Sequence, residues 1–141
     1  MAKIGIRFVT IGILYTLLAM SLGIWMGVNQ DFQNAHLHAH INLVAGVWFI
    51  LFALVYKAYP AMASAPLAMV HFWLANLGAV IFLPGIYIAM NYDNPLLAII
   101  GSLLSIAAMA VFLINFRRNY AVEPSSSLAD SLAISARRPV V

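Results

Sequence analysis

Cysteine is absent from this sequence of 141 residues, and its absence excludes several kinds of site. Structural disulfides, thiolate zinc sites, iron–sulfur clusters and covalently attached c-type haem all require cysteine. Any metal that this chain binds must therefore be held by imidazole, thioether or oxygen ligands.

Charged residues are also scarce. They make up 8% of the sequence, whereas hydrophobic residues make up 65%, and ordinary soluble domains carry about a quarter charged residues. The composition therefore predicts a protein of the lipid bilayer. The acids lie outside the apolar runs, and the membrane region has no nucleophile with a base and no phosphate-binding loop, so we expect neither hydrolysis nor phosphoryl transfer. The four acids are Asp31, Asp93, Glu123 and Asp130.

Four long apolar runs make up most of the remaining sequence. They cover residues 6–28, 37–59, 67–90 and 95–116, and each reaches the ~20 residues that a helix needs to cross a hydrocarbon core of about 30 Å. The links between them are short and rich in turn formers, which favours antiparallel neighbours. We therefore predict an all-α, integral membrane four-helix bundle of up-down-up-down topology over residues 1–118. Residues 119–141 are predicted to form a flexible tail, with a short surface helix over residues 127–136.

The basic residues predict the orientation of the bundle. In the predicted topology all seven lie on one side of the membrane, whereas the opposite side holds Asp31 and Asp93. The positive-inside rule then puts both termini in the cytoplasm, in a bacterial inner membrane. The first run is longer than the core of a signal peptide and no cleavage site follows it, so we expect it to be retained. A basic margin facing anionic lipid explains the high isoelectric point, and nothing indicates nucleic-acid binding. The basic residues are Lys3, Arg7, Lys57, Arg117, Arg118, Arg137 and Arg138.

Three of the four histidines, His36, His38 and His40, fall within five residues at the start of the second run. On a helix, His36 and His40 share a face and His38 points to nearly the opposite side. Polar groups at the rim of a membrane helix need partners, and a metal ion or a haem iron suits a neutral imidazole. The alternative is an interfacial rim in which the imidazoles bond to loop carbonyls. Asn34 is a plausible N-cap for this helix.

Other side chains near the level of these histidines could complete a site. Met20 and Met26 of the first run are candidate thioether ligands, suited to haem or Cu(I), although methionine more often fills gaps in packing. Asn42 faces in roughly the same direction as His38 and could orient its imidazole.

The fourth histidine, His71, is predicted to lie much deeper. Counting residues from the middle of each link places it ~20 Å from His40, so the two cannot bind the same atom within one protomer. We expect His71 to be hydrogen-bonded by Tyr56 or Asn76. Tyr56 itself is interpreted as an interfacial aromatic residue.

A longer pattern begins at these histidines. It consists of a His-x-His pair, an early glycine and an aromatic–proline exit, followed by a helix that opens with His-Phe and later contains Phe-x-Pro. In this pattern the chain resembles the tenth and eleventh transmembrane helices of subunit I of haem-copper oxidases. It also resembles the small stand-alone four-helix proteins often grouped with that subunit in bacteria. The matching residues are His38-Ala39-His40, Gly46, Tyr59-Pro60, His71-Phe72, Gly78 and Phe82-Leu83-Pro84.

The resemblance implies that His38 and His40 are axial ligands of haem, since in the family the first histidine of the pair binds the active-site haem and the second binds the low-spin haem. It implies no haem role for His71. It covers residues 35–90, and the family's copper-binding histidines, cross-linked tyrosine and other low-spin haem ligand have no counterpart here. One chain therefore cannot assemble a complete oxygen-reducing centre.

The function expected from these residues is that of a membrane haem b protein, which transfers electrons or binds oxygen or nitric oxide. A homo-oligomer would complete the coordination, and a respiratory-chain protein is a candidate partner. Two alternatives remain. One is a copper or zinc binder that uses His36, His38 and His40 and assists a respiratory oxidase, and the other is a non-catalytic oxidase-like scaffold subunit.

Overall fold

The computed structural model describes residues 3–120, and these residues are helical with short links and no strands. The predicted tail therefore lies outside the described residues except for Asn119 and Tyr120. The helices are α1 (Lys3–Asn29), α2 (Ala35–His40), the π-helix η1 (Ile41–Val47), α3 (Trp48–Ala58), α4 (Pro60–Ser64), α5 (Pro66–Tyr92) and α6 (Leu96–Asn119).

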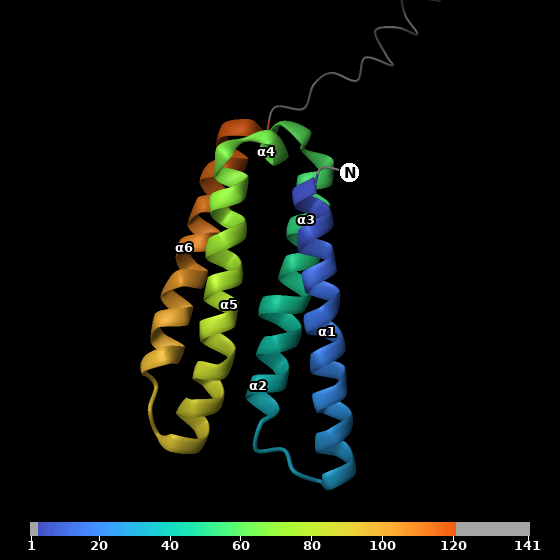
Figure 1. Cartoon of the computed structure of the whole chain (residues 1–141), viewed down its shortest axis with the longest axis vertical. Coiled ribbons are helices and arrows are strands. Elements are labelled where there is room, and N and C mark those ends of the chain that lie inside the picture. Colours follow the sequence, from blue (N-terminus) through green and yellow to red (C-terminus); the bar gives the residue numbers. More distant parts are fainter. Residues whose placement is uncertain (1–2, 121–141) are drawn as a thin grey trace, which may run out of the picture.

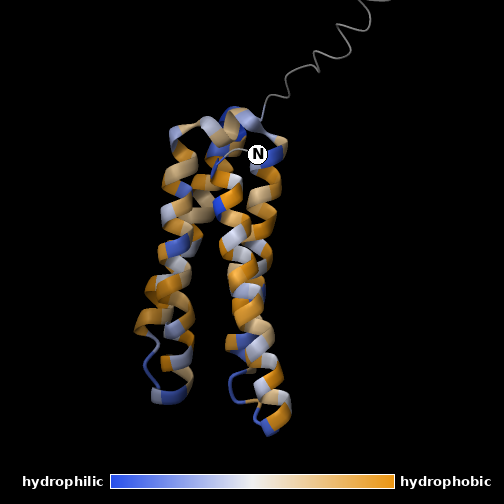
Figure 2. Ribbon diagram, turned by 45° about the vertical axis from the view of Figure 1, so that its right-hand side comes forward, coloured by the Kyte–Doolittle hydropathy of each residue, from blue (hydrophilic) through white to orange (hydrophobic). Residues whose placement is uncertain are grey.

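The prediction of an all-α membrane bundle is confirmed. Within residues 3–120, four helical segments are long and apolar enough to cross a membrane: α1, the continuous run α2–η1–α3, α5 and α6. Hydrophobic residues follow the lengths of these segments, and hydrophilic residues gather at the two ends of the molecule (Figure 2). Large apolar side chains are exposed along all four segments, as expected where the surrounding solvent is lipid.

The four segments form two antiparallel hairpins (Figure 1). In the first hairpin, α1 packs along η1 and α3, and in the second, α5 packs along α6. The short helix α4 joins the hairpins at the end where the chain begins, which we call the connector end. The opposite end, with residues 30–34 and 93–95, is called the loop end. The hairpins contact each other much less than their own helices do.

The two helices of the second hairpin pack closely, because glycines on each helix contact the backbone of the other. A side chain at Gly101 would collide with the backbone of Phe82, and one at Gly85 would collide with the backbone of Ala98. Small residues at such crossings let membrane helices approach closely and gain van der Waals contact.

The second membrane segment differs from the single α-helix predicted for residues 37–59. Its middle, Ile41–Val47, is a π-helix that begins immediately after His40. Gly46 lies in this stretch, where a Cβ atom would be 2.6 Å from Oγ1 of Thr16, so α1 presses closely on it. Single π turns inside α-helices are frequent at functional sites.

The helix ends show a second difference from the sequence-based expectation. Asn34 stands at the N-cap position of α2, but its side chain makes no capping hydrogen bond, and its Oδ1 atom is buried without a partner. The expected side-chain cap is therefore wrong. At the connector end, α5 begins at Pro66, whose missing N–H costs nothing in the first turn of a helix.

Candidate functional site

His38 is held against the first membrane helix. Its Nδ1 atom lies 2.9 Å from the carbonyl oxygen of Ala19 on α1. Since a carbonyl only accepts hydrogen bonds, Nδ1 must carry the proton, and Nε2 is left with a lone pair. Gly23 makes room for this ring, because a Cβ atom there would lie 2.8 Å from Cε1 of His38.

His40 has the same protonation pattern, reached through a different partner. Its Nδ1 atom lies 2.7 Å from the carbonyl oxygen of His36, one turn earlier on its own helix. The ring packs edge-to-face on Phe82 of α5, with 5.4 Å between ring centroids. Here too the carbonyl fixes the proton on Nδ1 and leaves the Nε2 lone pair for another partner.

The three histidines are close in sequence, but the structure does not bring their side chains together into one set of metal ligands. His38 contacts α1, His40 contacts α5, and His36 is exposed. Among residues 3–120, no three His, Cys, Asp or Glu side chains are grouped as a metal ion would need. A site made by converging imidazoles of one chain is therefore not formed in this conformation.

The secondary candidates have distinct positions. Asn42 places its Nδ2 atom 3.4 Å from Nε2 of His38, so it touches the nitrogen that a metal would use rather than the one that orients the ring. Met20 is 56% exposed to the surroundings, whereas Met26 is 4% exposed and belongs to the protein interior.

An apolar cleft of about 420 Å³ lies beside the histidines, between the two hairpins. Pro84 forms part of its wall, and Leu37 and Ile41 contribute the helix face that lies between His38 and His40. Neither histidine lines the cleft itself. The lining residues are Tyr15, Leu18, Leu37, Ile41, Ala79, Val80, Leu83, Pro84 and Tyr87.

A second polar group lies toward the connector end and links three helices. Nδ1 of His71 is 3.1 Å from the hydroxyl of Tyr56, which confirms the predicted partner, while Asn76 bonds to the carbonyl of its own helix instead. The hydroxyl of Tyr56 also lies 3.5 Å from Nδ2 of Asn115 on α6. We call His71, Tyr56 and Asn115 the buried triad.

All three members of the buried triad have 0% of their surface exposed. The interpretation of Tyr56 as an interfacial aromatic residue is therefore wrong, because its position near the end of a hydrophobic run did not reveal that two other helices cover it. Asn115 was missed altogether. The sequence did contain an indication of its role, because Asn115 is a lone amide in an otherwise apolar stretch. Such a polar side chain in a membrane helix needs a partner inside the protein.

The phenylalanines around His71 separate it from the other histidines. The rings of Phe8, Phe52 and Phe112 lie 5.0, 4.5 and 5.0 Å from its imidazole, centroid to centroid. His71 thus belongs to the core of the connector half, as its predicted depth suggested.

No protein-family model, curated protein or solved structure matches this chain. The resemblance to the oxidase subunit therefore stays a hypothesis.

Proposed function

We propose that this protein binds haem b in the membrane and uses His38 and His40 as axial ligands. The observation that carries the proposal is the protonation pattern of the two rings. Each Nδ1–H group is fixed by a backbone carbonyl, at 2.9 Å for His38 and 2.7 Å for His40. Histidines that ligate metals nearly always donate their other ring N–H in this way, which orients the imidazole and makes it more basic.

The donor set suits a haem better than a bare metal ion. An iron already held by four porphyrin nitrogens needs only one or two imidazoles, whereas copper or zinc needs three or four converging ligands. The structure offers single imidazoles that point to different neighbours. The apolar cleft beside them, which neither ring lines in this conformation, would supply walls suited to a hydrophobic macrocycle once an imidazole turns toward it.

A haem in this position would supply one-electron transfer, and an open axial position would allow a diatomic gas such as oxygen or nitric oxide to bind. The chain's own residues would orient the imidazoles and exclude water. Because the two rings of one protomer diverge, a second copy of the protein would supply any second ligand to the same iron. The proposal therefore includes a homo-oligomer.

The proposal also places the protein in a bacterial inner membrane with both termini in the cytoplasm. Its support is the distribution of charge over the described residues. The connector end carries Lys3, Lys57 and Arg117, whereas the loop end carries Asp31 and Asp93. Basic residues stay preferentially on the cytoplasmic side, and the histidines would then lie near the periplasmic face.

The test is an optical spectrum of the protein purified in detergent from haem-supplied cells, combined with metal analysis. We expect a Soret band that is lost or strongly reduced in His38→Ala and His40→Ala. His36→Ala is the matched control, because its exposed imidazole should leave the band unchanged.

Other outcomes would contradict the proposal in distinguishable ways. Copper or zinc without a Soret band, lost in His36→Ala, would indicate the three-histidine metal site. A colourless, metal-free protein would leave the scaffold hypothesis. If a haem is present, a spectral shift on adding carbon monoxide to the reduced protein would indicate an open axial position, and an unchanged spectrum would indicate electron transfer alone.

A further inference from the structure

The hydrogen bonds of the buried triad favour one tautomer of neutral His71, and the side chain of Asn115 is the first link in this network. Oδ1 of Asn115 lies 2.9 Å from Nδ2 of Asn119, and its Nδ2 lies 3.1 Å from the carbonyl oxygen of Met62. These partners, one a donor and the other an acceptor, determine which end of the amide is which. The Nδ2 atom that faces Tyr56 is therefore a donor.

Asn115 donates to the hydroxyl oxygen of Tyr56, and among residues 3–120 the only acceptor in hydrogen-bond contact with that hydroxyl is Nδ1 of His71, 3.1 Å away, so pairing of the hydroxyl proton favours donation to Nδ1. Nδ1 is then an acceptor, and the ring proton of neutral His71 lies on Nε2. This is the opposite tautomer to that of His38 and His40, so His71 offers a donor rather than a lone pair.

The Nε2 atom of His71 has no hydrogen-bond partner although it is fully buried. Buried donors are paired in the great majority of cases, and an unpaired one is unfavourable. The site therefore calls for an acceptor. The two nitrogens of an imidazole point to different sides of the ring, so Nε2 lies away from the Tyr56 hydroxyl and from the connector-end contacts of Asn115.

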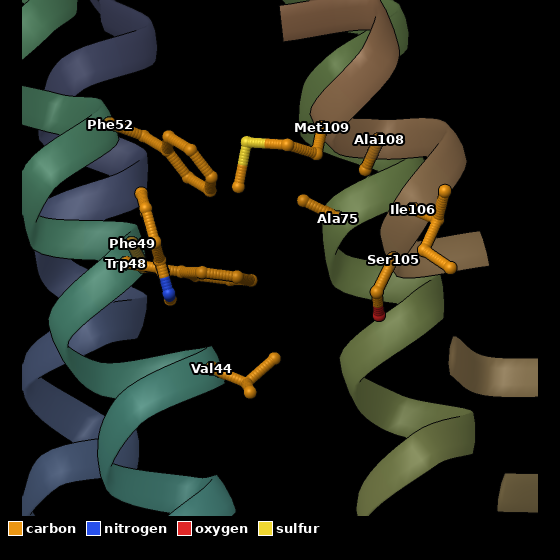
Figure 3. A pocket seen from close by; sticks show the side chains of 9 residues that line it. All are labelled: Val44, Trp48, Phe49, Phe52, Ala75, Ser105, Ile106, Ala108 and Met109. Atoms are coloured by element: carbon orange, nitrogen blue, oxygen red, sulfur yellow. The ribbon is translucent and has the colours of Figure 1, made fainter. Parts of the chain in front are cut away.

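A cleft lies between the hairpins (Figure 3), and His71 is not among the residues that line it. The volume of the cleft is about 290 Å³. Phe52 is shared between the two features, because its ring packs perpendicular to His71 at 4.5 Å and also lines the cleft. Ala75, one helical turn beyond His71 on α5, lines it as well. The lining residues are Val44, Trp48, Phe49, Phe52, Ala75, Ser105, Ile106, Ala108 and Met109.

We propose that this cleft binds a lipid-soluble aromatic carbonyl compound of the quinone class, whose carbonyl oxygen accepts a hydrogen bond from Nε2 of His71. Three features specify this occupant. The donor without a partner requires an acceptor, the aromatic wall of Trp48, Phe49 and Phe52 suits a flat ring, and none of the lining residues carries a charge that would favour an ionic ligand.

The size and position of the cleft agree with this ligand. At about 290 Å³ it lies just below the ~300–1,000 Å³ range of small-molecule pockets, so it would hold a head group while an alkyl tail stays in the lipid. Because Phe52 contacts His71 and lines the cleft, whereas His71 does not line it, the proposal requires the Phe52 ring to turn when the ligand binds. The proposal concerns binding only and does not depend on the haem site.

The test uses Trp48 as a fluorescent reporter, because its side chain lines the cleft. Trp25→Phe and Trp73→Phe remove the other two tryptophans, and His38→Ala and His40→Ala keep the protein free of haem. A short-chain benzoquinone is titrated into this protein in detergent. We expect saturable quenching, whereas a matched protein that retains only the lipid-exposed Trp73 should show quenching that rises linearly with quinone.

Variants of the site then separate specific binding from partition into the micelle. His71→Phe should raise the Kd about tenfold, as loss of a hydrogen bond predicts, and Ala75→Phe should abolish saturable quenching by filling the cleft without adding a fluorophore that competes with Trp48. Asn76→Ala, on the same helix, should leave the Kd unchanged.

Two results would overturn the proposal. One is linear quenching of Trp48, and the other is a Kd that His71→Phe leaves unchanged. If His71→Phe does not fold, competition in the His71-containing protein decides the matter: an alkylbenzene without carbonyl groups should fail to displace the quinone, and equal competition would refute the role of the Nε2–H donor.

Discussion

Gly23 allows us to test whether the Nδ1 hydrogen bond of His38 matters for haem binding. Gly23→Ala would place a Cβ atom 2.8 Å from Cε1 and 3.3 Å from Nδ1 of His38. Carbon atoms do not approach so closely, so the imidazole must move away from the carbonyl of Ala19. Gly27→Ala is the matched control one turn later on α1, because a Cβ atom there has no neighbour within 4 Å.

The two substitutions should affect stability and haem affinity differently. An alanine in place of a helical glycine is favourable by about 0.5–1 kcal/mol, and Gly27→Ala should gain this amount. At Gly23 the lost hydrogen bond costs about 0.5–1.5 kcal/mol, so the free energy of unfolding should change little. Loss of the partner that orients a ligating histidine costs 10–100-fold in affinity, and we expect about a tenfold weaker haem complex.

The assay is a titration of each purified protein with haem, followed by the Soret absorbance. A second measurement that needs no haem is the side-chain nitrogen NMR spectrum of His38, which reports whether Nδ1–H remains hydrogen-bonded. If Gly23→Ala displaces the ring by NMR but binds haem as tightly as Gly27→Ala, the link between the carbonyl bond and haem ligation is refuted.

Three further predictions concern the fold and its orientation. Asn115→Ala should lower the free energy of unfolding by about 1–2 kcal/mol, because buried partners on two other elements lose their donor, whereas Asn76→Ala should cost below about 0.5 kcal/mol; detergent-denaturation curves measure both. Gly101→Val should cost about 1–3 kcal/mol or prevent folding by overpacking the second hairpin, read by the same curves. In a chain without cysteine, Asp93→Cys should react with a membrane-impermeant maleimide added to intact spheroplasts, and Ser64→Cys should not; the reverse pattern would invert the proposed topology.

The sequence was sufficient to predict the helices because membrane spans depend on local composition. Runs of apolar residues predicted four spans, and the structure has four helices long enough to cross. The π-helical stretch after His40 was not predicted; its Gly46 lies close to Thr16 of the first helix, a contact between residues far apart in sequence that local composition does not reveal.

The sites were predicted less completely, for the same physical reason. The opposite directions of His38 and His40 follow from helix geometry, and the structure agrees. Which group each ring contacts depends on the neighbouring helix, so the partner carbonyl of Ala19 could not be inferred. Likewise, the contact between Tyr56 and Asn115 could not be inferred, because it forms only where three helices pack together.

The division into two hairpins has a consequence for how the chain enters the membrane during synthesis. The first hairpin carries only Tyr56 of the buried triad, whereas the second brings His71 and Asn115. If the hairpins insert one after the other, the amide and the imidazole arrive last and find the tyrosine already in place. Newly made protein truncated before α5 would then lack both hydrogen bonds to Tyr56, and its tyrosine hydroxyl would be left without these partners in the membrane.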